Sequence, residues 1–421
     1  MLFLAAGLSF FDRQVLSVLA PVIRSAIGMD NVSYSWVLFA YLLSYSAMFT
    51  IGGRLIDRLG TRRGLALSVG IWSLASLLHS IAHNAAQLGL LRFCLGFGEG
   101  GCFPGTAKGV LEWFPKQERA VAMGFATVGG SAIGAVIAPP VVAWVAVYVG
   151  WRGAFLLTGV IGALWLLAWY LMYSLPGNSR FVSGAERQYI LQEAGAPSEP
   201  QKTPRATPWV EFFRLKQVRG LILARFFFDP VLYFYMFWIP QYLNEVRGAS
   251  LQRIGQLSWI PFLILGVSSV LGGWVSDRLV LHGMTVDKAR KAILLASALL
   301  TPVSILAVVA QRAESAILLM GVLMFAHGFW MTNYMTMIGD LFPSSDVGTV
   351  IGLTGTAGGI GGFLTSLLIG KIVQSISYTP VFIAAGLTYP FCVLILLFTI
   401  RNIEPIHLRS RTQSDRCGAF L

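Results

Sequence analysis

Charge is scarce in this chain. Of its 421 residues only 12% are charged, whereas 56% are hydrophobic. A typical soluble protein carries about 25% charged residues, so the composition excludes a soluble enzyme of this length, a disordered chain and a coiled coil. The apolar runs match the roughly 20 residues that a helix needs to cross a bilayer and exceed the roughly ten of a membrane β-strand. Because lipid satisfies no backbone hydrogen bonds, the sequence predicts an all-α membrane protein.

Cysteine is also rare. The four cysteines, Cys94, Cys102, Cys392 and Cys417, form no Cys-x-x-Cys pair and have no histidine at metal-ligand spacing. Neither a disulfide framework nor a metal site is expected, and no cofactor is predicted. The sequence contains no HExxH, GxSxG or paired-aspartate membrane motif, so it does not indicate an enzyme.

The excess of positive charge, +12 at pH 7, does not indicate a nucleic-acid partner. Lys and Arg concentrate in short stretches between apolar segments, without interleaved aromatic residues. This is the pattern of the positive-inside rule for proteins in a lipid bilayer. Basic residues in 58–63, 116–119, 177–218, 288–291 and 401–411 predict the cytoplasmic face of the inner (plasma) membrane, with both termini on that face.

Twelve segments are apolar and long enough to span the roughly 30 Å of bilayer hydrocarbon. A polar, proline-containing stretch at 177–218 separates six of them from the other six. Within it, Ser183-Gly-Ala-Glu186 is a capping-box pattern and predicts a short surface helix. The predicted spans lie near 2–26, 33–54, 65–83, 86–113, 120–149, 152–175, 219–245, 252–276, 291–311, 314–338, 347–373 and 379–400.

The two halves of the chain repeat each other. Gly52-Gly-Arg-Leu-Ile-Asp-Arg-Leu59 recurs as Gly272-Gly-Trp-Val-Ser-Asp-Arg-Leu279, and Phe114-Pro115 recurs as Phe342-Pro343. Since each half has an even number of spans, the repeats share one orientation, as in transporters that bind substrate between two parallel halves at mid-membrane. The expected organisation is an N-terminal six-helix half (1–176), a cytoplasmic linker (177–218), a C-terminal six-helix half (219–402) and a cytoplasmic tail (403–421).

The repeated loops carry charges at matching places, namely Asp57, Arg58 and Arg62 in the first copy and Asp277 and Arg278 in the second. Glycines in both copies allow close helix approach and a tight turn. Their arginines are expected to pair across the interface between the halves. The predicted role of these five residues is gating by making and breaking charge pairs, rather than binding substrate.

Several stretches resemble a known family. The loop at 53–63 resembles the signature of the major facilitator superfamily. Phe11-Asp-Arg-Gln-Val-Leu-Ser-Val-Leu-Ala-Pro21 and the stretch Arg92–Pro104 are similar to the anion:cation symporter family within it. The stretches at 225–240 and 340–352 are most similar to its bacterial hexuronate branch. The resemblance covers essentially the whole chain and implies a secondary active transporter that carries a sugar acid with protons by alternating access.

Four charged side chains lie deep in predicted spans, where each costs roughly 2.5–3.5 kcal/mol and is functional by default. Asp12 and Arg13 are adjacent in the first span and point about 100° apart, so one can face a cavity and the other a neighbouring helix. Arg92 and Glu99 lie on one face of the fourth span. We expect Asp12 and Glu99 to couple protons. Arg13 should bind the substrate carboxylate, and Arg92 should compete for Glu99 and contribute to substrate binding; the alternative is a purely structural ion network.

Aromatic and small polar side chains could complete a sugar pocket. Tyr41 and Tyr45 lie one turn apart on the second span, Tyr233 lies on the seventh, and Trp330 and Asn333 lie on the tenth. Rings can stack on sugar faces, and hydroxyl or amide groups can meet sugar hydroxyls, although any single aromatic is more often ordinary packing. Tyr45 is favoured because similar transporters carry a tyrosine at the matching place.

Four further residues allow more than one interpretation. Arg225 and Asp229, one turn apart on the seventh span, predict a local ion pair, and Asp229 could equally be a third titrating carboxylate. His79 and His83, at the outer end of the third span, are expected to be interfacial residues without a chemical role.

The preferred hypothesis is proton-coupled symport of a monocarboxylate sugar acid, a hexuronate such as glucuronate or galacturonate. The alternatives are an aldonate such as galactonate or another organic anion and, more distantly, a drug/proton antiporter, which the basic residues of the cavity disfavour. No appended soluble domain indicates a sensor. The proton gradient would supply the energy, and the protein is expected to be a monomer.

Overall fold

A computed structural model describes residues 1–115, 118–180, 182–193 and 209–406. Within these residues every regular element is a helix. The elements are α1 (Leu2–Ile27), α2 (Asn31–His79), α3 (Ala85–Glu99), α4 (Cys102–Trp113), α5 (Arg119–Met123), η1 (Gly124–Gly129), α6 (Gly130–Val149), α7 (Trp151–Met172), η2 (Pro176–Asn178), α8 (Gly184–Glu193), α9 (Trp209–Arg214), α10 (Lys216–Glu245), α11 (Leu251–Leu257), α12 (Ile260–Leu281), α13 (Val286–Leu300), η3 (Thr301–Val308), α14 (Ala313–Leu341), α15 (Ser344–Ser375) and α16 (Thr379–Thr399).

The all-helical membrane fold predicted from the sequence is confirmed. Among the described residues, nine helical segments are long and apolar enough to cross a bilayer. The other three predicted spans correspond to α2, which contains two of them, and to α3 followed by α4, which together form the third. The predicted surface helix is also present as α8, where the Ser183 hydroxyl accepts a hydrogen bond from the backbone N–H of Glu186 at 3.2 Å.

The long helix α2 is kinked at Gly60. This glycine has φ of 76° and ψ of 159°, a conformation that residues with a side chain rarely adopt. The kink lies in the repeated loop that the sequence predicted to turn between the second and third spans. A single glycine thus reverses the path of the chain where a longer loop was expected.

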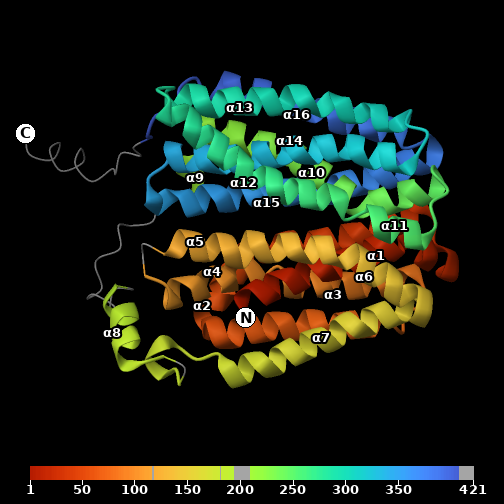
Figure 1. Cartoon of the computed structure of the whole chain (residues 1–421), viewed down its shortest axis with the longest axis horizontal. Helices are drawn as coiled ribbons and strands as arrows, with labels where there is room; N and C mark the ends of the chain where they lie inside the picture. The colour runs from red at the N-terminus through yellow and green to blue at the C-terminus, as the bar shows by residue number, and fades with distance from the viewer. Residues whose placement is uncertain (116–117, 181, 194–208, 407–421) are drawn as a thin grey trace, which may run out of the picture.

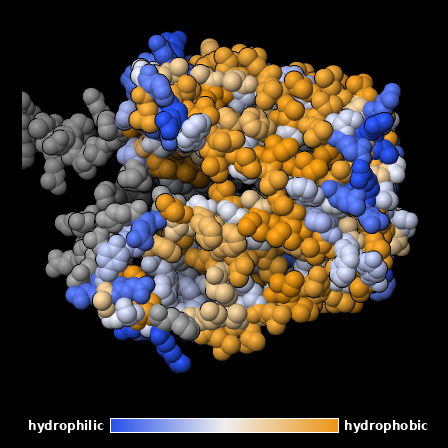
Figure 2. Space-filling view, viewed as in Figure 1, coloured by the Kyte–Doolittle hydropathy of each residue, from blue (hydrophilic) through white to orange (hydrophobic). Residues whose placement is uncertain are grey.

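The helices form two halves that lie side by side, an N-terminal half containing α1–α7 and a C-terminal half containing α9–α16 (Figure 1). The long helices of both halves lie along one common axis, and α8 lies at one end of the bundle. We call this the linker end and the opposite end, where α11 lies, the far end. Apolar side chains cover the flank of the bundle and hydrophilic ones gather at both ends (Figure 2), as expected of a protein that crosses a bilayer.

Polar contacts join the two halves toward the far end. Arg24 of α1 donates to the side chain of Gln241 at 2.7 Å and forms an ion pair with Glu245, both on α10. Deeper in the interface, the Ser17 hydroxyl donates to the carbonyl of Met236 at 2.5 Å. Between the halves toward the linker end, the molecule is hollowed (Figure 2). The structure therefore holds its halves together at the far end and apart at the linker end.

A second far-end contact uses Gln374 at the end of α15. Its side-chain oxygen accepts from the backbone N–H of Asn31 at 3.0 Å, and its amide donates to Asp30 at 3.3 Å. Asp30 also caps α2 by accepting from Ser33. The side-chain and backbone hydrogen bonds from Ser33 lower the pKa of Asp30 below its usual value, so this cap stays ionised near neutral pH.

Removing the ion pair between Arg24 and Glu245 should loosen the far end. A partly exposed ion pair contributes up to about 1 kcal/mol, which corresponds to about a fivefold change in an equilibrium constant. Glu245→Gln should therefore shift the population a few-fold toward a state that is open at the far end. Spin labels can be placed at the exposed positions Tyr148 and Ile376, which lie in opposite halves. The open state would appear as an added population with a longer distance between the two labels.

The matched control is Glu314→Gln. Glu314 pairs with Arg253 in an exposed far-end contact inside the C-terminal half, so its loss should leave the distance between the halves unchanged. Equal distance distributions in the wild type and Glu245→Gln would contradict the assignment of Arg24–Glu245 as a contact that holds the far end closed.

Candidate functional site

The site lies where two helices of the N-terminal half, α1 and α3, bring their charged residues together. Asp12 and Arg13 lie in the middle of α1, and Glu99 is the last residue of α3. The sequence predicted one continuous helix over 86–113, but the structure breaks it at Gly100 and Gly101, directly after Glu99. The cluster of glycines around this position was the sequence signal for the helix break. Discontinuous helices of this kind occur at transporter binding sites.

Arg13 and Glu99 form a buried ion pair. The Arg13 Nε atom donates to Glu99 Oε2 at 2.8 Å, and the two side chains are 4% and 0% exposed. The Tyr41 hydroxyl donates to the same carboxylate oxygen at 2.7 Å. The Arg13 guanidinium also lies 4.3 Å from the ring centroid of Tyr45 and 4.5 Å from that of Phe10. The structure thus brings four of the predicted site residues together: Glu99, with Arg13 and Tyr41 on its carboxylate and Tyr45 against Arg13.

Asp12 points away from this pair, as its position next to Arg13 predicted. Its Oδ1 atom accepts from the Ser76 hydroxyl at 2.9 Å, inside the N-terminal half. Arg92 is 1% exposed and lies close enough to Asp12 and Glu99 for their charges to interact. In the part of the chain that the structure describes, Arg92 Nε and Nη2 have no hydrogen-bond partner. The direct partner of Glu99 is therefore Arg13, while Arg92 lies nearby with free donors.

Aromatic rings extend the site toward the C-terminal half. Tyr41 stacks on Tyr45 with ring centroids 5.8 Å apart, and it meets the edge of Phe237 of α10 at 6.0 Å. Phe237 in turn stacks on Tyr233 at 6.4 Å. Tyr233 therefore approaches the cluster from the opposite half, as a residue of a shared pocket would.

The C-terminal half contains a second buried ion pair. Arg225 Nε donates to Asp229 Oδ2 at 3.0 Å within α10, and the side chains are 10% and 11% exposed. Arg225 Nη1 also donates to the hydroxyl of Thr354 on α15 at 3.2 Å. This confirms the local ion pair that the spacing predicted.

Trp330 and Asn333 lie inside the C-terminal half. Trp330 is fully buried against Phe228 and Tyr389, at centroid distances of 5.8 and 5.3 Å. The Asn333 amide donates to the carbonyls of Phe329 at 2.9 Å and Gly272 at 3.2 Å, which binds α14 to α12. The structure does not bring these two residues to the cluster around Glu99, because their neighbours belong to the core of their own half.

His79 was placed wrongly by its sequence position. It is fully buried rather than interfacial, because α7 covers this end of α2. Its ring stacks on Phe155 of α7 at 4.9 Å, and Nδ1 donates to the carbonyl of Ala75 at 2.5 Å. His83 is exposed, as expected. Among the described residues, no three His, Cys, Asp or Glu side chains come together where a metal ion could bind.

Two arginines of the repeated loops, Arg62 and Arg278, contact their own halves, and among the described side chains no ion pair joins the two loops across the interface as predicted. Arg62 donates to the carbonyl of Tyr170 at 2.7 Å, and the Arg278 guanidinium lies 5.4 Å from the ring centroid of Trp274. Arg58 is exposed, and the side chain of Asp57 lies outside the described residues. The halves stand apart at the linker end (Figure 2), which agrees with arginine contacts that stay inside each half.

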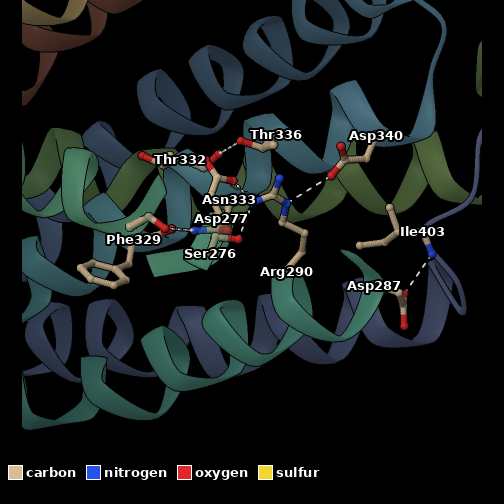
Figure 3. A network of polar contacts seen from close by, with 11 residues as sticks. Ser276, Asp277, Asp287, Arg290, Phe329, Thr332, Asn333, Thr336, Asp340 and Ile403 are labelled. Carbon is tan, nitrogen blue, oxygen red and sulfur yellow. Dashed lines mark hydrogen bonds and ion pairs between the residues drawn. The ribbon is translucent and has the colours of Figure 1, made fainter. Parts of the chain in front are cut away.

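Asp277 belongs to a charge network centred on Arg290 of α13 (Figure 3). Arg290 pairs with Asp277 at 3.4 Å and with Asp340 at 3.2 Å, and it also donates to the Ser276 hydroxyl. Arg290 and Asp340 were not among the predicted site residues, although the sequence repeat contains a signal for Asp340. Asp340 precedes Phe342-Pro343 just as Glu112 precedes Phe114-Pro115.

Glu112 has a matching role in the N-terminal half. It accepts from the hydroxyls of Thr61 at 2.8 Å and Tyr173 at 2.7 Å. In each half, an acidic residue near the end of one helix is thus linked to the repeated loop, directly through Thr61 in the N-terminal half and through Arg290 in the C-terminal half. The two halves therefore share side-chain contacts as well as sequence motifs.

Comparison with known proteins agrees with this architecture. The sequence pattern of the Major Facilitator Superfamily matches residues 2–282 and again 279–416. The "Hexuronate transporter" of Escherichia coli (strain K12) is 27% identical over 98% of this chain and 95% of the relative. The "D-galactonate transporter" of Escherichia coli O6:H1 is 30% identical over 90% and 89%. Among solved structures, a "D-xylose-proton symporter" matches with a TM-score of 0.77 at 14% identity, over 96% and 97%.

The ion pair between Arg13 and Glu99 predicts strong coupling in a double-mutant cycle. Removing one partner of a buried pair leaves an uncompensated charge and typically costs about 3–5 kcal/mol. Arg13→Met and Glu99→Gln should each lower the thermal unfolding temperature in detergent, and the double variant should recover much of the loss. The exposed pair, tested with Arg253→Met and Glu314→Gln, should show little coupling. Additive effects at Arg13 and Glu99 would show that the two charges do not stabilise each other.

Proposed function

Because the chain belongs to the major facilitator superfamily, we propose that it is a proton-coupled symporter of sugar-acid anions, with a hexuronate such as glucuronate or galacturonate as its substrate. The observation that carries this proposal is the shared carboxylate of Glu99, which both Arg13 and Tyr41 hold. The names of the similar transporters support a sugar acid as the cargo.

The geometry supports a direct competition between Glu99 and the substrate. An arginine guanidinium offers several donors to carboxylates, and Glu99 occupies one of those of Arg13. When Glu99 takes up a proton, it loses its negative charge, and its ion pair with Arg13 is lost. The carboxylate of a sugar acid can then replace Glu99 at Arg13, so that proton and substrate load together.

The charge balance supports one proton for each substrate. Asp12, Arg13, Arg92 and Glu99 cancel when all are ionised, so a bound uronate leaves the site at −1. Moving this charge against an inside-negative potential costs about 2.3 kcal/mol per 100 mV. One accompanying proton removes this cost. The Asp12 carboxylate bonds to Ser76, but Asp12 is the chain neighbour of Arg13 and would sense occupancy through that substrate-binding residue.

The distribution of charge supports an orientation. Arg58, Arg62, Lys288 and Lys291 lie at the linker end, which we take as cytoplasmic by the positive-inside rule. Both termini would then be cytoplasmic in the inner (plasma) membrane, and the hollow would open inward. Alternating access would close the linker end, where the loops with Arg58 and Arg278 could meet, and open the far end. We propose that the protein does this as a monomer.

The same site bears on two other cargo classes, favouring one and disfavouring the other. An aldonate such as galactonate offers Arg13 the same carboxylate, and one similar transporter carries that name. A cationic drug would instead face the guanidiniums of Arg13 and Arg92. Uptake of labelled glucuronate, galacturonate and galactonate into proteoliposomes under a pH gradient, with a cationic dye as competitor, separates these possibilities.

Arg13→Lys should lose most binding of the sugar acid. Lysine keeps the positive charge but cannot form the bidentate contact of a guanidinium with a carboxylate. We expect an increase of at least tenfold in the half-saturation concentration for uronate exchange, with normal expression in the membrane. Wild-type affinity in this variant would show that Arg13 does not hold the substrate carboxylate.

Glu99→Gln imitates the protonated carboxyl and should separate binding from coupling. The variant should still bind uronate and exchange it across the membrane, because Arg13 is released. It should not accumulate uronate under a pH gradient, because no proton is released at this position. If its vesicles concentrate uronate as well as the wild type does, the coupling site is Asp12 or Asp229 instead.

A further inference from the structure

The ion pair between Arg225 and Asp229 has no role in the coupling just proposed, although it is as costly to bury as any charged group in a membrane protein. The helix α15 is shaped around it. A Cβ atom on Gly358 would lie 1.9 Å from Asp229 Oδ2, and one on Gly355 would lie 3.6 Å from Arg225 Nη1. Glycine at 358 is therefore required for the carboxylate to occupy its place.

This ion pair lies beside the interface between the halves. Gly359, the next residue of α15, touches the N-terminal half, since its Cβ atom would lie 2.1 Å from the Ser46 hydroxyl oxygen of α2. Both side chains remain about one-tenth exposed rather than sealed in the core. The pair is thus a buried charge centre at the edge of the C-terminal half.

Tyr233 connects the two charge centres. It lies one helical turn after Asp229 on α10, so both project from one face. Its ring also stacks on Phe237, which meets the edge of Tyr41 beside Arg13 and Glu99. A molecule held at Arg13 and reaching toward the C-terminal half would therefore meet Tyr233 and, one helical turn along α10, Asp229.

We propose that Arg225 and Asp229 bind the end of the sugar acid opposite its carboxylate, and that Asp229 excludes aldarates, which carry a second carboxylate at that end. This inference rests on the proposed function. An ionised aspartate accepts hydrogen bonds from sugar hydroxyls, while Arg225 donates to their oxygens. A second carboxylate would meet the like charge of Asp229, whose side chain is only 11% exposed.

Exclusion of one ligand by repulsion is a common route to specificity. Arg225 alone would attract the second carboxylate of an aldarate through a bidentate contact. Its partner Asp229 cancels that attraction. The ion pair therefore presents hydrogen-bonding groups without the net positive charge that would select dicarboxylates.

The test compares two unlabelled competitors in proteoliposomes containing the full chain. Glucuronate carries one carboxylate, and glucarate carries two. Each is titrated against exchange of labelled glucuronate in the wild type, in Asp229→Asn and in the control Glu314→Gln, which loses an acidic residue from an exposed pair of the same half. The measured quantity is the ratio of the half-inhibitory concentrations of glucarate and glucuronate.

The wild type and Glu314→Gln should favour glucuronate by at least tenfold. Asp229→Asn should lower the ratio by at least tenfold, because it leaves Arg225 without its negative partner. A wild type that prefers glucarate, or a ratio in Asp229→Asn within twofold of the wild type, would overturn the inference. Failure of the wild type to exchange any sugar acid would instead refute the proposed function.

A second variant covers a possible folding defect in Asp229→Asn. The neutral double variant Arg225→Gln/Asp229→Asn leaves no unpaired charge. It should bind glucuronate about tenfold more weakly and show no gain for glucarate, because Arg225 is absent. Wild-type affinity for glucuronate in this double variant would show that the pair does not contact the sugar.

Discussion

The cost of burying charge in a membrane-spanning bundle governs this structure. Arg13 and Glu99 compensate each other in the N-terminal half, and Arg225 and Asp229 do so in the C-terminal half. The second pair needs space that an ordinary helix does not offer, and Gly358 of α15 provides it against Asp229. In the N-terminal half, glycines instead break the helix directly after Glu99. In both halves, glycines therefore lie next to the buried charges.

Periodic and local signals made the fold predictable. Long apolar runs gave the helices, the polar stretch at 177–218 separated the halves, and the capping box at Ser183 marked α8. What failed depended on packing between distant segments. The burial of His79 comes from α7, and the break after Glu99 comes from how α3 and α4 fit against α2, where Gly98 and Gly101 approach Ser68.

The site was only partly predictable for the same reason. The sequence named Arg13, Glu99, Tyr41 and Tyr45, because charge and aromatic rings deep in spans are conspicuous. It could not tell that Glu99 meets Arg13 rather than Arg92, since pairing between helices depends on their rotation. It also could not separate Asn333, which joins two helices of one half, from residues that face the other half. Arg290 was missed because its partners lie on two other helices, α12 and α14, that the sequence could not place beside it.

The exposure of the far-end contact has a consequence for how the surroundings act on the protein. Arg24 and Glu245 are 15% and 30% exposed, whereas Arg13 and Glu99 are almost fully enclosed. Dissolved ions screen exposed charges over about 8 Å at physiological ionic strength but reach enclosed ones far less. Under the proposed alternating access, the salinity of the medium at the far end should therefore act on which side of the bundle is closed at rest. Ionic screening hardly weakens the enclosed pair between Arg13 and Glu99. Ionic conditions should therefore change how often the protein turns over without changing what it recognises.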